Sequence, residues 1–308
     1  MNVITPAEAL EILKTREINS LLRICDEINT DRLSAEVPFC SIINAKSGNC
    51  SEDCTFCAQS AISSASFEPY AILDDRSILA ARRRAGEQGA GHFSIVTSGR
   101  SVTEKELQHI CGTVSGGGNG KPFWCASLGI LSLRQLRLLK RAGLKRYHHN
   151  LETAETYFPK ICTTHTWQER VNTVRNAKLA GLEVCSGGII GLGESLRQRV
   201  DLAFHLRDTG VNSIALNILV QVKGISIRSP RKYLSPADML KTVAMFAMVC
   251  PDSELRLCAG REFLGEYQKD IFRAGVTGLM TGDLLTTDGS QVEDDLELLR
   301  IAGKIPES

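Results

Sequence analysis

The sequence predicts an α/β fold, a single (βα)8 TIM-type barrel preceded by a helical extension. One observation is a repeated junction, in which a basic amphipathic helix ends at a Gly and an apolar or β-branched run follows at once. The junction occurs at residues 84–86, 141–144, 179–182, 208–211 and 273–276. A second observation is that eight strand–helix alternations with short loops fit into 308 residues. This pattern favours one closed parallel barrel over two domains.

The expected elements begin with a helix at which Thr5 caps, Pro6 occupies the first helical position and Glu8 completes a capping box. At the later junctions, a Gly in the left-handed conformation closes each helix, and the next residues enter a strand. Strands are expected at 38–44, 92–97, 122–128, 146–151, 183–188, 213–220, 254–259 and 278–282, with helices between them, for example at 131–142, 168–180 and 236–249. We expect a helical segment at 1–37, the barrel at 38–303 and a tail at 304–308.

The charge and hydropathy of the chain exclude several classes of partner. A net charge of +1 offers no electrostatic footprint for nucleic acid or for an anionic membrane. The N-terminus lacks the basic and apolar segments of a secretory signal, and no apolar run is long enough to span a bilayer. We therefore expect a cytoplasmic protein that binds neither nucleic acid nor membranes. In a reducing compartment, the eleven cysteines indicate metal binding or catalysis.

Three of these cysteines form a compact motif directly after the first expected strand. Residues 50–57 read CSEDCTFC, so that Cys50, Cys54 and Cys57 have C-x3-C-x2-C spacing. In a parallel barrel this position is the C-terminal mouth, where active sites form. Three thiolates can hold three irons of a [4Fe–4S] cluster and leave the fourth iron open for S-adenosyl-L-methionine. A structural zinc site would usually add a fourth ligand, commonly from a second C-x2-C pair, and no such pair is present.

This loop resembles the cluster loop of the biotin synthase family over SIINAKSGNCSEDCTFCAQS at 41–60. Further matches follow in the same order: YHHNLET at 147–153, TTHTWQERVN at 163–172, VCSGGIIGLGE at 184–194, NILVQVKG at 217–224 and LRLCAGRE at 255–262. The resemblance covers roughly residues 38–303. It implies a radical S-adenosylmethionine enzyme that inserts sulfur between two unactivated carbons of dethiobiotin to form biotin.

The resemblance also implies roles for residues around the first cluster, which Cys50, Cys54 and Cys57 would hold. Phe56 matches the aromatic position beside the adenine, and Arg170 matches a position near the methionyl carboxylate. Glu152 matches an acidic position near the ribose, although an exposed ion pair of Arg170 with Glu152 is the alternative. Gly187 and Gly188 would let the backbone approach the cofactor closely.

Substrate contacts are expected from two amides and one imidazole. Asn150 and Asn217 can both donate to and accept from a ureido ring, unless each bonds only to neighbouring backbone. His148 stands where many family members have Asn. It is a candidate proton donor, ligand contact or packed core histidine.

The auxiliary cluster is where the sequence departs from the family. Members typically hold a [2Fe–2S] cluster with three Cys and one Arg, and Cys125, Cys185 and Arg256 fall on three of those positions. Ser94 occupies the fourth, and serine is a poor ligand for such a cluster. Cys258 stands two residues beyond Arg256, where members have Ser, and residues two apart on a strand share a face.

Three interpretations of this change stay open. In one, Cys258 replaces the missing ligand of a [2Fe–2S] cluster. In another, which we favour, Cys125, Cys185 and Cys258 hold three irons of a four-iron cluster, and the open iron carries a replaceable sulfide. In the third, the auxiliary cluster is lost and the reaction differs. The remaining cysteines, Cys25, Cys40, Cys111, Cys162 and Cys250, belong to no motif and are expected to be structural.

The resemblance further implies a flavodoxin or ferredoxin as electron donor and a homodimeric assembly. One rival function is another small radical enzyme, of the carbon-skeleton mutase or hydrogenase-cofactor maturase type, which would not need the auxiliary ligands. A second rival is a non-enzymatic metal carrier or iron–sulfur scaffold, which would not cleave S-adenosylmethionine.

Overall fold

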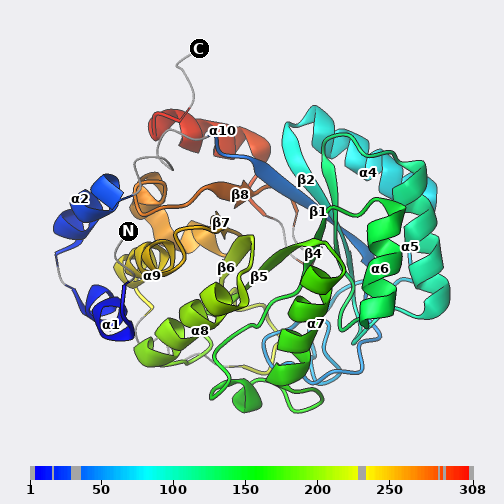
Figure 1. Cartoon of the computed structure of the whole chain (residues 1–308), viewed down its shortest axis with the longest axis horizontal. Helices are drawn as coiled ribbons and strands as arrows, with labels where there is room; N and C mark the ends of the chain where they lie inside the picture. Colours follow the sequence, from blue (N-terminus) through cyan, green and yellow to red (C-terminus); the bar gives the residue numbers. More distant parts are fainter. Residues whose placement is uncertain are drawn as a thin grey trace.

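A closed barrel of eight parallel strands forms the centre of the molecule, and helices surround it (Figure 1). The computed structural model describes residues 4–15, 17–28, 36–227, 234–283, 285–286 and 289–304. The strands pair in sequence order, and β8 closes on β1. They are β1 (Phe39–Lys46), β2 (Ala90–Thr97), β3 (Phe123–Ser127), β4 (Arg146–His148), β5 (Glu183–Ile190), β6 (Ser213–Ile218), β7 (Glu254–Leu257) and β8 (Gly278–Met280). The predicted (βα)8 barrel is confirmed.

Helices connect successive strands, and most begin with a side chain that caps free backbone N–H groups. The helices are α1 (Pro6–Lys14), α2 (Ile18–Ile28), α4 (Asp75–Glu87), α5 (Glu104–Gly116), α6 (Leu133–Ala142), α7 (Trp167–Leu179), α8 (Leu196–Thr209), α9 (Pro236–Val249) and α10 (Val292–Ile301), with the 3-10 segments η1 (Phe158–Lys160) and η2 (Arg261–Asp270). The predicted capping box of Thr5 and Glu8 is present at α1. The predicted helix at 236–249 agrees with α9 at both ends.

Four of the five predicted helix-to-strand junctions have the expected left-handed glycine, namely Gly143, Gly181, Gly210 and Gly275. The prediction at 84–86 is wrong, because α4 continues past Gly86 to Glu87. The positive φ occurs instead at Gly89, directly before β2. Several strands are also shorter than predicted, although single hydrogen bonds continue beyond their ends, such as those from the His149 and Leu151 N–H groups to β5. For example, β4 ends at His148 rather than at residue 151.

The two N-terminal helices lie outside the barrel wall, beside α8 and α9 (Figure 1). Helix α9 is buried along most of its length because α1 and α2 cover it from outside. Residues 29–35, which connect α2 to the segment before β1, lie outside the described residues. The predicted tail, 304–308, is described only at Lys304.

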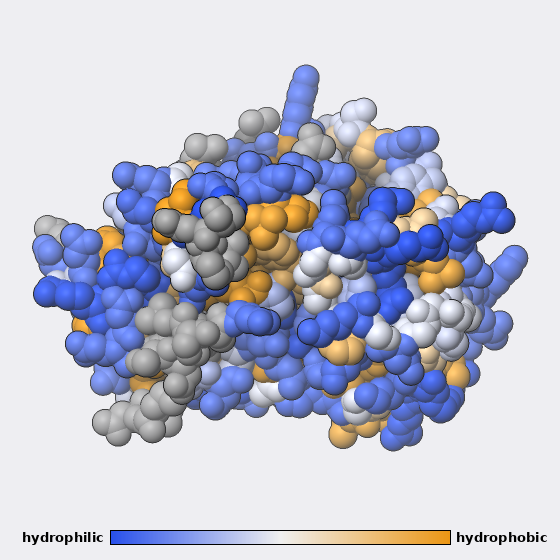
Figure 2. All heavy atoms as spheres, turned by 90° about the horizontal axis from the view of Figure 1, so that it is seen from above, coloured by the Kyte–Doolittle hydropathy of each residue, from blue (hydrophilic) through white to orange (hydrophobic). Residues whose placement is uncertain are grey.

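The surface of the molecule is more polar than its buried core. On the face seen in Figure 2, hydrophilic residues predominate, and hydrophobic residues form a group near the centre and smaller groups elsewhere. Among the helices that the structure describes, none is both long and apolar enough to cross a membrane. The apolar residues of the chain are thus used mainly to pack helices against the barrel.

Candidate active site

A cavity of about 380 Å³ occupies the barrel interior, and every strand or its carboxyl-terminal end contributes to its lining. At the mouth, Phe56 and Arg170 line it, and further in the lining includes Cys125, Cys185 and Arg256. One continuous cavity therefore joins the residues predicted for the cofactor with those predicted for the auxiliary cluster.

The three-cysteine loop follows β1 and is fixed by backbone contacts. The Thr55 N–H donates to the Ile161 carbonyl over 2.9 Å, and the Thr163 N–H donates to the Asp53 carboxylate over 2.8 Å. At the start of the loop, Gly48 has a φ of +77°, and a Cβ there would lie 2.7 Å from Pro69 Cβ. Only glycine suits this turn, which directs the loop back over the mouth.

A buried thiolate in this loop requires a nearby positive charge. It raises the pKa of the Cys57 thiol to about 11, so that the thiol stays protonated in the absence of a bound positive charge. Metal binding requires thiolates, and a bound iron cluster supplies the charge that stabilises them. The residues present therefore fit the cluster that the motif predicts.

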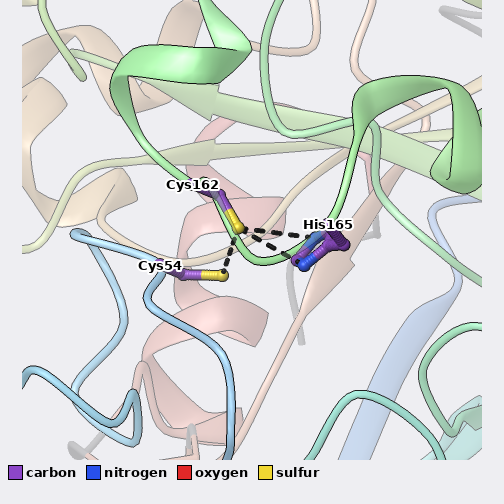
Figure 3. A group of neighbouring side chains, drawn as sticks. All are labelled: Cys54, Cys162 and His165. Carbon is purple, nitrogen blue, oxygen red and sulfur yellow. Dashed lines mark hydrogen bonds between the residues drawn. The ribbon is translucent and has the colours of Figure 1, made fainter.

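A cluster of polar residues lies directly beneath this loop, which the sequence analysis did not single out. Cys162 Sγ lies 3.7 Å from Cys54 Sγ and 3.3 Å from His165 Nδ1 (Figure 3). The ligand atoms of Cys54, Cys162 and His165 all lie within 4.8 Å of one another, close enough to share one metal ion. His165 is held by Glu52, whose carboxylate lies 2.5 Å from Nδ1. Cys162, expected to be only structural, thus contacts a predicted cluster ligand.

Arg170 connects this cluster with the cavity. Its Nη2 donates to the Glu152 carboxylate over 2.9 Å, Nε donates to the Asn150 carbonyl over 2.5 Å, and Nη1 lies 3.0 Å from His165 Nε2. The side chains of Arg170 and Glu152 are only 12% and 11% exposed, so the alternative of an exposed surface pair is wrong. Glu152 Oε2 is buried and, among the described residues, has no hydrogen-bond partner. It is available to a ligand hydroxyl.

The two predicted substrate amides differ in their contacts. Asn150 Oδ1 is buried and finds no partner among the residues described, as expected for a group that awaits a ligand. Asn217 already bonds to backbone: Nδ2 donates to the Gly188 carbonyl over 3.3 Å, and Oδ1 accepts from the Ala259 N–H over 3.2 Å. Both residues line the cavity, but only Asn150 leaves its side-chain amide oxygen without a partner among the described residues.

The predicted glycines serve strand packing. A Cβ at Gly187 would lie 1.9 Å from the Ala215 carbonyl oxygen, and one at Gly188 would lie 2.4 Å from that of Glu152. Side chains at either position would separate β5 from β6 or displace the Glu152 turn. These contacts position Glu152 and are a reason for the two glycines independent of any cofactor.

His148 lines the cavity and is half-buried, and desolvation lowers its pKa to about 4. A neutral imidazole at this position accepts or donates a hydrogen bond without carrying charge.

Deeper in the barrel, Cys125, Cys185, Cys258 and Arg256 all line the same cavity, as does Ser94. Arg256 and Cys258 thus share the interior face, as their spacing predicted. Burial raises the pKa of the Cys125, Cys185 and Cys258 thiols, so that their thiolates also require a nearby positive charge.

A further thiol of this region was not predicted from the sequence. Cys40 of β1 lines the cavity, and Arg256 Nη1 donates to its Sγ over 3.0 Å. Nor was Arg146 predicted, which is 5% exposed and binds Glu183 and Glu254. The only available signal for Cys40 was its place within a predicted strand, and that signal does not say which face it occupies.

The fold and the loop together define the class of the protein: a parallel barrel with a C-x3-C-x2-C loop at its carboxyl-terminal mouth is a radical S-adenosylmethionine enzyme. In agreement, residues 45–206 match the Radical SAM superfamily, and residues 215–305 match the Biotin and Thiamin Synthesis associated domain. These two matched segments meet between α8 and β6 and are parts of one barrel.

Known relatives narrow this class. The chain is 44% identical to the biotin synthase of Acetivibrio thermocellus over 98% of this chain and 94% of that protein. It is 46% identical to the biotin synthase of Maridesulfovibrio salexigens over 93% and 88%. The chain belongs to the biotin synthase family. Among solved structures, methylornithine synthase is similar with a TM-score of 0.82 at 14% identity, covering 99% of this chain and 95% of that one, which shows a shared fold.

Proposed function

We propose that the chain converts dethiobiotin to biotin by radical sulfur insertion. The observation that carries this proposal is the single cavity that runs from the three-cysteine loop to the buried thiols. A substrate lying in it would touch both ends at once, as hydrogen abstraction at one end and sulfur capture at the other require. When bound, the first cluster with S-adenosylmethionine supplies a 5′-deoxyadenosyl radical, and the auxiliary cluster supplies sulfide.

In this proposal, Cys50, Cys54 and Cys57 hold the first cluster. Arg170 places its guanidinium near the methionyl carboxylate, and the free Oε2 of Glu152 accepts from a ribose hydroxyl. Arg170 also orients Glu152 through their ion pair, so the two act as one unit. Phe56 covers the adenine.

The substrate would lie against Asn150, Asn217 and His148. The unpartnered Oδ1 of Asn150 accepts from a ureido N–H. Asn217, whose amide already bonds to backbone on two sides, acts mainly by fixing the wall of the cavity. The enclosed barrel excludes water from the reacting carbons.

The auxiliary cluster would be held by Cys125, Cys185 and Cys258, with Arg256 beside them. The three thiols line one cavity with a guanidinium, which suits an anionic cluster. We favour a four-iron cluster with one open iron over a [2Fe–2S] cluster, because Ser94 removes the usual fourth ligand.

We further propose that residues 38–303 form one catalytic domain, with 1–37 as a helical extension and 304–308 as a tail. A flavodoxin or ferredoxin would supply electrons, and the chain would act as a homodimer. None of its eleven cysteines, all of which lie in the described residues, forms a disulfide, which is typical of proteins in a reducing cytoplasm.

The test is an anaerobic reaction of the reconstituted protein with dethiobiotin, S-adenosylmethionine and dithionite, followed by mass spectrometry. Biotin together with 5′-deoxyadenosine is the expected result. Deoxyadenosine without biotin would retain the enzyme class and overturn the substrate, as for a mutase or a maturase. Iron binding without deoxyadenosine would indicate a carrier or scaffold.

A further inference from the structure

The register of the barrel places Cys40 in the same layer as two predicted auxiliary ligands. Cys40 pairs with His92 of β2, and His92 pairs with Phe123 of β3. Cys125 lies two residues beyond Phe123, so one step across two strands and two residues along leads from Cys40 to Cys125. The same step leads from Cys125 to Cys185, and from Cys185 to Arg256. A fourth step leads from Arg256 back to Cys40. In barrels of this kind, four side chains from alternate strands form one interior layer, and these four residues are such a layer.

Cys40 provides a thiol close to Ser94, the position at which this chain lacks the family's cysteine ligand. Ser94 lies on the strand next to β1, two residues beyond the partner of Cys40, and both side chains line the cavity. Ser94 Oγ is buried and has no hydrogen-bond partner among the described residues. A thiol is therefore missing from β2, and one is present on the neighbouring strand at the same depth as Cys125 and Cys185.

The spacing of these thiols suits a cluster better than a single ion. The group that the described residues offer to one ion, with all ligand atoms within 4.8 Å, is the one at the mouth that contains Cys54. No three interior thiols of the described residues have all their sulfur atoms within 4.8 Å of one another, and a cluster of several irons and sulfides needs such wider spacing.

The contacts of Arg256 indicate a supporting role. Its Nε donates to Ser213 Oγ over 3.0 Å, Nη2 donates to Glu254 over 2.7 Å, and Nη1 donates to Cys40 Sγ over 3.0 Å. All three nitrogens thus act as donors, and a guanidinium has no lone pair to offer while it stays protonated. Arg256 is placed to stabilise a thiolate at Cys40.

We propose that Cys40 is a fourth thiolate ligand of the auxiliary cluster, so that β1, β3, β5 and the end of β7 each supply one cysteine. This proposal rests on the auxiliary cluster of the proposed function. It replaces an open iron by a fully cysteine-ligated cluster, in which Arg256 is a hydrogen-bond donor.

The test isolates the second site. A parent variant with Cys50→Ala, Cys54→Ala and Cys57→Ala lacks the first cluster, so that its iron, its sulfide and its Mössbauer spectrum report the interior site alone. Into this parent we would introduce Cys40→Ala or the control Cys111→Ala, which removes a thiol of α5 outside the cavity. After anaerobic reconstitution, Cys40→Ala should lose at least half of the bound iron or change its spectrum, and Cys111→Ala should match the parent.

Two further results decide between explanations. If Cys40→Ala retains the iron and spectrum of the parent, Cys40 is not a ligand, and the proposed function stands. If the parent itself binds no iron, the auxiliary cluster and the role of Cys40 both fail. To exclude misfolding, Cys40→Ala with Ser94→Cys should recover iron, because it returns a thiol to the adjacent strand; a folded double variant without iron would contradict the ligand role.

Discussion

The molecule has two groups of cysteines, and they are built in opposite ways. At the mouth, Cys50, Cys54 and Cys57 lie on one short loop, fixed by contacts with the segment around Ile161. In the interior, the thiols come from separate strands and are positioned by the register of the whole barrel. The first group depends on local contacts that a single substitution can disturb. The second depends on the barrel closing, so its geometry is as rigid as the fold.

The electrostatic surroundings differ as well. Beneath the loop, Arg170 is balanced by Glu152, and His165 by Glu52. In the interior, Arg256 and Arg146 are 2% and 5% exposed. Both bind Glu254, but Arg256 also donates to the Cys40 thiol and belongs to the same layer. A buried positive charge of this kind favours thiolates and an anionic cluster. The interior is therefore electrostatically suited to an anionic cluster.

The largest effect is expected at the loop. Cys54→Ala removes one of three adjacent thiolates, and no other member of the motif can replace it. We expect no detectable 5′-deoxyadenosine and a loss of about four irons per chain, since a cluster with two ligands is not retained. Anaerobic iron analysis and mass spectrometry would measure both. Deoxyadenosine at the wild-type rate would contradict the role of this loop.

Arg170→Ala should have the next largest effect. Losing a charge-assisted contact costs about 1.5–3 kcal/mol, so we expect the KM for S-adenosylmethionine to rise about 10- to 100-fold. Part of this effect passes through Glu152, which would lose its partner. Arg175→Ala, on an exposed part of the same helix, is the matched control. Steady-state kinetics with equal effects in both variants would show that the change is structural.

The two cysteine groups also explain what the sequence could predict. The loop was found because its residues are adjacent, and the capping box of Thr5 and Glu8 was predicted from the same kind of local pattern. The barrel itself was predictable from repeated helix-to-strand junctions. The predicted ends of helices and strands were less accurate, as at Gly86, where α4 continues to Glu87.

Cys40 and Cys162 were beyond the reach of the sequence for a different reason. Cys40 acquires its neighbours through strand pairing, and the sequence does not state which face of β1 is interior. Cys162 meets Cys54 because two loops more than one hundred positions apart cross at the mouth. Neither contact has a local pattern, so both cysteines were placed with the structural ones.

A smaller effect concerns the base of the barrel, where Glu254 accepts from Arg146 over 2.8 Å and from Arg256 over 2.7 Å. Burial alone would raise the pKa of Glu254, but Arg256 and Arg146 outweigh it and lower the pKa to about 2. The folded pKa lies below the ordinary value of 4.5, so this carboxylate stabilises the fold above pH 4.5 and loses its effect as the pH falls towards 2.

Glu254→Gln should therefore reduce the free energy of unfolding by about 1–2 kcal/mol at pH 7, a value discounted for partial exposure. The difference from the wild type should shrink between about pH 4.5 and 2. Urea titrations of the cluster-free protein at several pH values would measure it, with the exposed Glu155→Gln as control. A difference that is constant with pH would show that the carboxylate charge is not responsible.

The smallest effect is expected at Cys162. At this position, spatial proximity and the sequence motif assign Cys54 to different sites. Proximity groups Cys162 with Cys54 and His165 around a single-ion position (Figure 3). The motif instead assigns Cys54 to a cluster with Cys50 and Cys57.

If the motif is right, Cys162→Ala keeps the iron of the first cluster and its deoxyadenosine formation, apart from a modest loss of stability from removing a buried thiol. The same variant should lower the uptake of Zn²⁺ by the cluster-free protein, because a mononuclear site would lose one of its three ligands. Parallel titrations with iron and sulfide, and with zinc alone, separate the two sites. Loss of iron in Cys162→Ala would make this thiol a cluster ligand, and the loop would then depend, like the interior layer, on residues brought together only by the fold.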